Sequence, residues 1–194
     1  MMTGTNLFNL EPFHDDEELN VVIETPKGSR NKYNYDEKLG LFKLGGVLPS
    51  GASFPFDFGF VPSTLGGDGD PLDVLVLMDE PAFAGCLVRT RLVGVVEAEQ
   101  TERDGETMRN DRLVGVAAGA RLHTRVRTLD DLGTTLLEEI EHFFASYNEF
   151  KGKVFKPLAR SGPGRATELV EEGVKQFRRS KRKRASSKKG KGKK

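Results

Sequence analysis

The sequence predicts an α+β fold in which a β-barrel is followed by two amphipathic helices. Up to about residue 117, short apolar or alternating segments are separated by closely spaced turn residues, which is typical of barrels. Apolar residues then recur at helical spacing over two stretches. Residues 178–194 contain eleven Lys or Arg residues and no acid, so we expect the packed fold to end before them.

The expected strands are runs of β-branched, aromatic or alternating residues between Gly, Pro and Asp turns. They lie at residues 20–24, 31–35, 41–44, 74–78, 87–97 and 112–117. Residues 101–110 are expected to form a polar hairpin or loop. Residues 54–60 carry four Phe side chains at every second position, on one face of an extended segment, and the expected role of these rings is core packing.

Two helices are expected in the second half of the chain. The first spans residues 132–150, where apolar side chains occupy one face and Glu and His residues the other. The second spans residues 165–178. The apolar positions that define these two helices are Leu136, Leu137, Ile140, Phe143, Phe144 and Tyr147, then Ala166, Leu169, Val170, Val174 and Phe177.

The charges divide the chain into a body and a tail. The chain has 30 basic and 29 acidic residues, and removing the eleven basic residues of 178–194 leaves a body of net charge about −10. We therefore expect a flexible arm at residues 1–19, a domain at 20–178 and a disordered basic tail at 179–194. Two interpretations of the tail stay open: contact with nucleic acid or another polyanion, and a solvated tail without a partner.

The cysteine count and the hydropathy pattern bear on the compartment. Cys86 is the one cysteine, so an internal disulfide is excluded, which fits a reducing cytosol. The N-terminus has no signal-peptide pattern, and no apolar run approaches the ~20 residues that span a bilayer. We expect a cytoplasmic protein with no membrane partner.

An acidic loop precedes the expected strand at 74–78. Asp68, Asp70 and Asp73 fall within six residues, among turn residues. Carboxylates this close repel one another unless a divalent cation or a positive group lies among them. Mg²⁺ or Mn²⁺ suits such an all-oxygen set. A plain turn stays open as an alternative, whereas a calcium EF-hand is excluded because its sixth position, here Asp73, requires Gly.

Several ordered blocks carry a resemblance to a known family. The run from Asp68 to Val74 resembles the signature of the family I soluble inorganic pyrophosphatases. Residues 22–33, 54–64 and 142–147 resemble its other blocks, in the same order. The similarity covers roughly residues 20–178. It implies a five-stranded OB-like β-barrel with two packed helices, and Mg²⁺-dependent hydrolysis of pyrophosphate to two phosphates, usually by a homohexamer.

The resemblance also implies roles for individual residues. Asp68 and Asp73 would be metal ligands, and Asp104 would supply a further one. Asp70 would hold the metal-bound nucleophilic water and take its proton, and Glu24 would support the metal cluster through water. The phosphate-binding side chains would be Lys32, Arg112 and Tyr147.

The chain departs from the family pattern at several site positions. Asn34 stands where the family has Glu, Gly46 where it has Arg, and Asn148 where it has Lys. Phe54 and Phe58 replace Tyr, Arg112 replaces Lys, and Asn110 replaces an Asp ligand, for which the adjacent Asp111 is a candidate substitute. Candidate replacements for the lost cations are Lys27, Arg30, Lys43, Lys151 and Lys153. The alternative function is therefore a catalytically impaired barrel that binds nucleic acid or polyphosphate through its tail.

Overall fold

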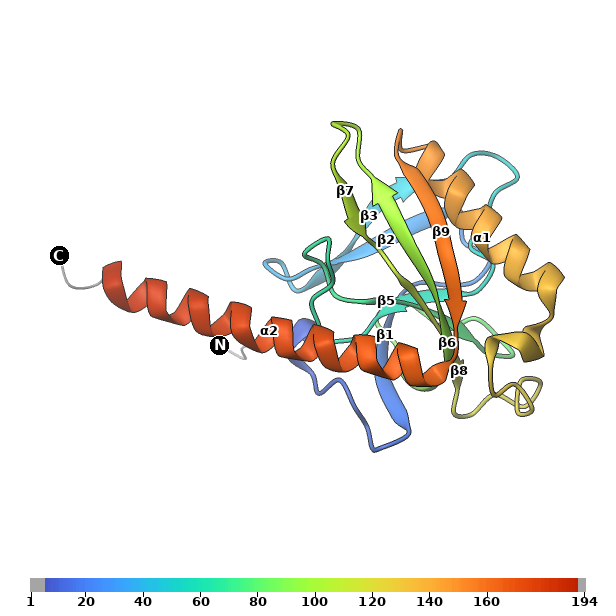
Figure 1. Ribbon diagram of the computed structural model, residues 1–194, viewed down its shortest axis with the longest axis horizontal. Helices are drawn as coiled ribbons and strands as arrows, with labels where there is room; N and C mark the ends of the chain where they lie inside the picture. Colours follow the sequence, from blue (N-terminus) through green and yellow to red (C-terminus); the bar gives the residue numbers. More distant parts are fainter. Residues whose placement is uncertain (1–5, 192–194) are drawn as a thin grey trace.

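The computed structural model describes residues 6–191 (Figure 1). Most of the regular structure is β-sheet, with two α-helices in the second half of the chain. The elements in order are η1 Leu7–Asn9, β1 Glu18–Thr25, β2 Asn31–Asp36, β3 Leu41–Val47, β4 Asp57–Phe60, β5 Asp73–Leu77, β6 Leu87–Thr101, β7 Thr107–Arg109, β8 Arg112–Ala117, η2 Leu129–Leu132, α1 Thr134–Glu149, β9 Val154–Ser161 and α2 Pro163–Lys191.

Five strands pair in a circuit that returns to its start. The order is β1-β4-β5-β8-β6, and β6 pairs again with β1. All of these pairs are antiparallel except β5 with β8, which is parallel. Strands β7 and β9 pair with β6, which makes the sheet seven-stranded, and β2 and β3 form a separate two-stranded sheet. The main sheet therefore has more strands than the five of the barrel that the resemblance implies.

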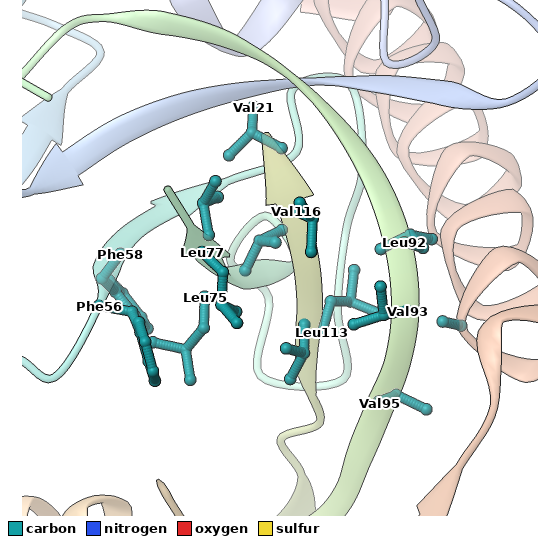
Figure 2. Close-up of a cluster of buried hydrophobic side chains, with 14 of the residues drawn as sticks. Val21, Phe56, Phe58, Leu75, Leu77, Leu92, Val93, Val95, Leu113 and Val116 are labelled. Carbon is teal, nitrogen blue, oxygen red and sulfur yellow. The ribbon is translucent and has the colours of Figure 1, made fainter. Parts of the chain in front are cut away.

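The main core lies inside this circuit. Strand β8 is buried along its whole length, and β5 is buried after its first residue. Figure 2 shows β6 curving around a cluster to which Leu75, Val93 and Leu113 contribute from three different strands. Burial on both faces explains why β5 and β8 are continuous apolar runs rather than alternating ones.

The four Phe residues of 54–60 divide between two clusters. Phe54, Phe56 and Phe58 pack in the main core, whereas Phe60 packs with Val22 and Tyr35 in a second, smaller cluster. Only 57–60 are in a strand, and the face that the whole segment was expected to share ends within β4, after Phe58.

The predicted flexible arm packs against the body over its described part. Phe8 contacts the rings of Tyr35 and Phe60 edge-on, at centroid distances of 5.1 and 4.9 Å. The Phe8 and Leu10 carbonyls accept hydrogen bonds from the Ser63 hydroxyl. Leu7, Phe8 and Leu10 thus cover the second cluster, and β1 already begins at Glu18.

Strand β9 has no counterpart among the expected elements. It pairs with β6, and its register shifts where Ala98 faces Pro157. Proline cannot donate to a ladder and is tolerated at such an irregularity. The exposed, proline-interrupted pattern of this strand gives little strand signal in sequence.

Helix α2 is longer than expected. It continues to Lys191 and projects past the body (Figure 1), so the disordered tail is not confirmed for residues 179–191. Its first half packs on β6, which removes the cost of helix nucleation, and Lys and Arg are good helix formers. Residues 192–194 lie outside the described part. No helix within residues 6–191 combines the length and the apolar character that a membrane span needs.

Shortening a core leucine is expected to destabilise the fold strongly. Leu75→Ala removes a fully buried side chain between β4 and β8 and should lower the free energy of unfolding by about 2–5 kcal/mol. The matched control is Leu41→Ala, at a side chain that is 62% exposed, which should change it by less than about 0.5 kcal/mol. Urea denaturation measures both variants, and equal losses would contradict this account of the core.

Candidate active site

A polar cavity of about 340 Å³ lies where the end of β1, the starts of β5 and β8 and the C-terminal turn of α1 meet. It contains every predicted site residue except Asp104. The charged and aromatic-hydroxyl side chains of its lining are Glu24, Lys32, Tyr35, Asp68, Asp70, Asp73, Arg112, Tyr147, Lys151 and Lys153.

The acidic loop forms one wall. The Asp70 amide donates to the Asp68 carboxylate at 3.1 Å, and the Gly66 amide donates to the Asp70 carbonyl at 2.7 Å, so the loop is closed on itself. Burial, together with the neighbouring Asp73 and Asp70 charges, raises the pKa of Asp68 to about 6. Burial and the Asp73 charge also raise the pKa of Asp70. Both carboxyls are therefore partly removed from water, beside other negative charges.

Glu24 reaches the cavity from a β-bulge. The register between β1 and β4 shifts between Ile23 and Thr25, which leaves Glu24 as the extra residue and turns its side chain away from the ladder. Its carboxylate accepts a hydrogen bond from the Lys32 ammonium at 2.7 Å and another from the Tyr35 amide at 2.8 Å. Burial raises the pKa of Glu24, and the Lys32 charge opposes that rise.

Asp73 and Arg112 form an ion pair because their strands run parallel. Val74 is in register with Leu113, so the residues that start β5 and β8 are neighbours. The guanidinium Nη1 of Arg112 donates to Asp73, and the guanidinium also lies over the Phe144 ring at 5.0 Å. The buried Nε of Arg112 has no hydrogen-bond partner within the described residues. The guanidinium of Arg112 is thus held at one edge by Asp73 and on one face by the Phe144 ring.

The C-terminal turn of α1 supplies a hydroxyl beside a second ammonium group. Lys151 donates to the Tyr147 hydroxyl oxygen, and its ammonium lies 4.0 Å from the centroid of the Tyr147 ring. Burial and the nearby charges of Lys32, Lys153 and Arg112 lower the pKa of Lys151 to about 8. Burial raises the pKa of Tyr147, so its hydroxyl keeps its proton and remains a donor.

Two amides occupy the wall beside the acids. The Asn110 side chain donates to the Gln100 carbonyl oxygen at 3.0 Å, and both side chains are buried and line the cavity. Gln100 was not singled out from the sequence. Extending the expected strand 87–97 to Thr101 would have found it. Gln100 then lies beside Asn110, whose amide donates to the Ala98 carbonyl of the same strand.

Asp104 and Asp111 do not join the carboxylates of the cavity. Asp104 lies exposed in the turn between β6 and β7, where it accepts a hydrogen bond from the Glu106 amide. The Asp111 carboxylate accepts from the Ala98 amide at 2.9 Å and pairs with Arg109 at 2.7 Å. Asn110 lines the cavity and Asp111 does not, so the structure does not bring the candidate substitute Asp111 into the cavity.

The rings and amides at the remaining altered positions serve packing. Phe54 contacts the Phe143 and Tyr147 rings, and the Lys32 ammonium lies 4.4 Å from the centroid of Phe58. The Asn148 side chain donates to the Phe144 carbonyl of its own helix at 2.8 Å. These residues shape the cavity and contribute no charge to it.

Comparison with known proteins decides the family. The family model described as inorganic pyrophosphatase matches residues 21–178. The chain belongs to the inorganic pyrophosphatase family. The inorganic pyrophosphatase of Synechocystis is 40% identical over 82% of this chain and 92% of its own length.

Solved structures agree with the sequence relatives. The inorganic pyrophosphatase of Thermus thermophilus superposes with a TM-score of 0.81 at 36% identity, covering 90% of this chain and 99% of its own. The Helicobacter pylori inorganic pyrophosphatase gives 0.79 at 35% identity, over 87% and 98%.

The donor set of the cavity fits a hard divalent cation. Four carboxylates line it, and two of them, Glu24 and Asp73, already face a basic side chain. Asp68 and Asp70 make no ion pair among the described residues, and burial, with a further contribution from neighbouring carboxylates, raises their pKa values. Among the described residues, His14, Asp15 and Glu18 have possible ligand atoms within 4.8 Å of one another, but this group lies outside the cavity. Asp68 and Asp70 are thus the carboxylates most in need of a counter-charge.

Divalent-ion binding should weaken in acid. The raised pKa of Asp68 means that this carboxyl is protonated below about pH 6, where a proton competes with the ion. We expect the Mn²⁺ dissociation constant to change little between pH 8 and 7, and to rise about tenfold per pH unit below 6. Calorimetric titration of the full chain measures this, and Asp68→Asn should flatten the profile. An affinity independent of pH from 5 to 8 would contradict the assignment.

Proposed function

We propose that this chain hydrolyses inorganic pyrophosphate to two phosphates with the help of a divalent cation. The observation that carries the proposal is the cavity itself: four carboxylates face four cationic side chains across about 340 Å³, in a chain that matches the family over residues 21–178. Pyrophosphate is an anion that binds together with a divalent cation. Its site therefore needs carboxylates for the cation and basic side chains for the phosphoryl oxygens.

The cationic wall binds and orients the substrate. Lys32, Arg112 and Tyr147 are the donors that face the acidic loop, and each is fixed by a neighbour: Glu24, Asp73 and Lys151 respectively. A fixed donor needs no reorganisation when charge develops on the phosphoryl oxygens. Arg112 offers a planar fork for two such oxygens, which the lysine of the family pattern lacks.

Asp70 acts on the water nucleophile. Its carboxylate makes no hydrogen bond within the described residues and faces the cavity, so it is free to accept a proton. The raised pKa brings the carboxyl closer to the range in which a general base works. Tyr147, which stays protonated, donates to a phosphoryl oxygen.

Magnesium is the cation we propose, with manganese as the alternative. Asp68, Asp70 and Asp73 would hold it, with Glu24 in support through water, because carboxylate oxygens are the ligands these ions prefer. When bound, the ion would lower the pKa of the attacking water and neutralise phosphoryl charge. Asp104 is left out of this set because it lies outside the cavity.

The remaining inferences concern architecture and partners. We infer that the closed strand circuit is the OB-like barrel of the family, that the chain assembles as a homohexamer, and that it works in the cytoplasm. We also infer that the basic extension of α2 contacts a polyanion in addition to catalysis. Its described side chains Arg178, Arg179, Lys181, Arg182 and Lys183 follow one another on a helix that projects from the body.

Removing the proposed base should stop turnover while a distant carboxylate should not matter. We expect Asp70→Asn to lower kcat for pyrophosphate about 10²–10⁴-fold with Mg²⁺ present. Asp104→Asn is the matched control, since it makes the same change outside the cavity, and it should keep wild-type kcat. Phosphate release measures both. Equal rates for wild type and Asp70→Asn would overturn the proposal.

The polyanion contact is tested by neutralising the described basic residues of α2. Replacing Arg178, Arg179, Lys181, Arg182 and Lys183 by Gln keeps the helix and removes five charges. We expect the dependence of RNA affinity on salt to flatten by about 0.7 for each phosphate that the helix no longer neutralises, with pyrophosphate hydrolysis unchanged. Fluorescence anisotropy at several salt concentrations measures the slope, and an unchanged slope would refute the interaction.

A further inference from the structure

A second cavity adjoins the catalytic one. It has a volume of about 190 Å³ and shares three lining residues with the first cavity: Lys32, Tyr147 and Lys151. These three residues form the junction between the two spaces. The rest of the lining comes from the end of β3 and from the residue that follows α1, namely Gly45, Gly46, Val47, Leu48, Pro49 and Phe150.

The walls of the second cavity are apolar away from the junction. The only polar side chains of its lining are the three shared ones. Val47 is 55% exposed and Phe150 is 63% exposed, so apolar surface faces solvent next to a highly polar site. Apolar walls of this kind suit an apolar ligand group better than a polar one.

Glycine keeps this space open. Gly46 is the register partner of Lys32, so a side chain at position 46 would lie on the same face as the Lys32 side chain. A Cβ built on Gly46 meets no atom within 4 Å. Gly45 is the extra residue of the bulge opposite Lys32 and Tyr33. The space is therefore open because Gly46 has no side chain. The backbone of Gly46 is not left-handed, so its conformation does not require glycine.

We propose that the site also takes organic diphosphates, in which an alkyl group is esterified to one end of the diphosphate. This rests on the proposed function, because the diphosphate would occupy the catalytic cavity. The alkyl group would pass between Lys32 and Lys151 and cover Val47 and Phe150. The space equals roughly six water molecules, which limits the group to a short chain.

An alkyl group fits this lining better than a sugar or a nucleoside. Hydroxyl groups and base edges need hydrogen-bond partners when they leave water. Beyond the junction the lining has no polar side chain to offer them. The two ammonium groups at the junction suit the phosphoryl charge at the point where the ester oxygen joins the chain.

Hydrolysis of such a substrate follows the proposed reaction. Water attacks the unsubstituted terminal phosphorus, a new P–O bond forms, and the anhydride P–O bond breaks. The bridging oxygen leaves with the alkyl phosphate, and Asp70 takes the proton of the water. The products are orthophosphate and an alkyl monophosphate, with no other co-reactant.

The test is a binding series with ligands that cannot turn over. Methylenediphosphonate and its methyl, ethyl, propyl and butyl monoesters are titrated calorimetrically into the full chain with Mg²⁺. We expect the dissociation constant to fall by up to about fourfold per added methylene. Gly46→Leu fills the second cavity and should abolish this trend, while changing the affinity for unsubstituted methylenediphosphonate less than about threefold. Gly164→Leu, at an exposed glycine of α2, should retain the wild-type trend.

Every outcome is informative. A flat series in the wild type, or a series that survives Gly46→Leu, overturns the inference. Val47→Ser is a smaller change on the cavity wall and should weaken the dependence of affinity on alkyl length. It provides a second test in case Gly46→Leu does not fold. Phosphate release from pyrophosphate is measured in parallel: a flat series with normal release rejects only the second cavity. Absent release together with a steep series rejects the hydrolysis and retains the binding site.

Discussion

Mutual repulsion of carboxylates is the constraint that organises this molecule. Asp68, Asp70 and Asp73 come from one loop, and Glu24 joins them from β1. In a partly dry cavity, charges of one sign are stable only when opposite charges are brought to them. Lys32 and Arg112 arrive from β2 and β8, and both are buried, so the arrangement depends on the sheet closing around the cavity.

Two features of the sheet deliver these counter-charges. The parallel pairing of β5 with β8 sets Arg112 beside Asp73, at the start of both strands. The bulge in β1 turns Glu24 toward Lys32, which belongs to a different sheet. The first pair joins residues 39 positions apart and the second joins residues eight positions apart on successive strands. Each is a consequence of register, so a one-residue slip in either strand would leave a buried charge without its partner.

The sequence predicted well what is contiguous and less well what depends on pairing. The acidic loop and the following strand were clear because Asp68 to Leu77 is one continuous pattern. The resemblance implied Asp104 as a metal ligand, but the β6–β7 turn carries this residue outside the cavity, and the length of β6 was underestimated. Gln100 was missed for the same reason. Strand β9 was missed because Pro157 and its exposed face hide the pairing with β6.

At the site positions where the chain departs from the family pattern, charged groups of both signs are missing, but the charges that remain in the cavity are balanced. The lining has Glu24, Asp68, Asp70 and Asp73 against Lys32, Arg112, Lys151 and Lys153, so the two signs are equal in number. The amide pair of Gln100 and Asn110 adds no charge to this balance. Lys151 and Lys153, which come from the end of α1 and the segment before β9, are two of the five candidate replacements for the lost cations, and they line the cavity, whereas Lys27, Arg30 and Lys43 do not. A cavity balanced in this way favours a ligand that is itself nearly neutral, and pyrophosphate meets that condition when it arrives with its cations.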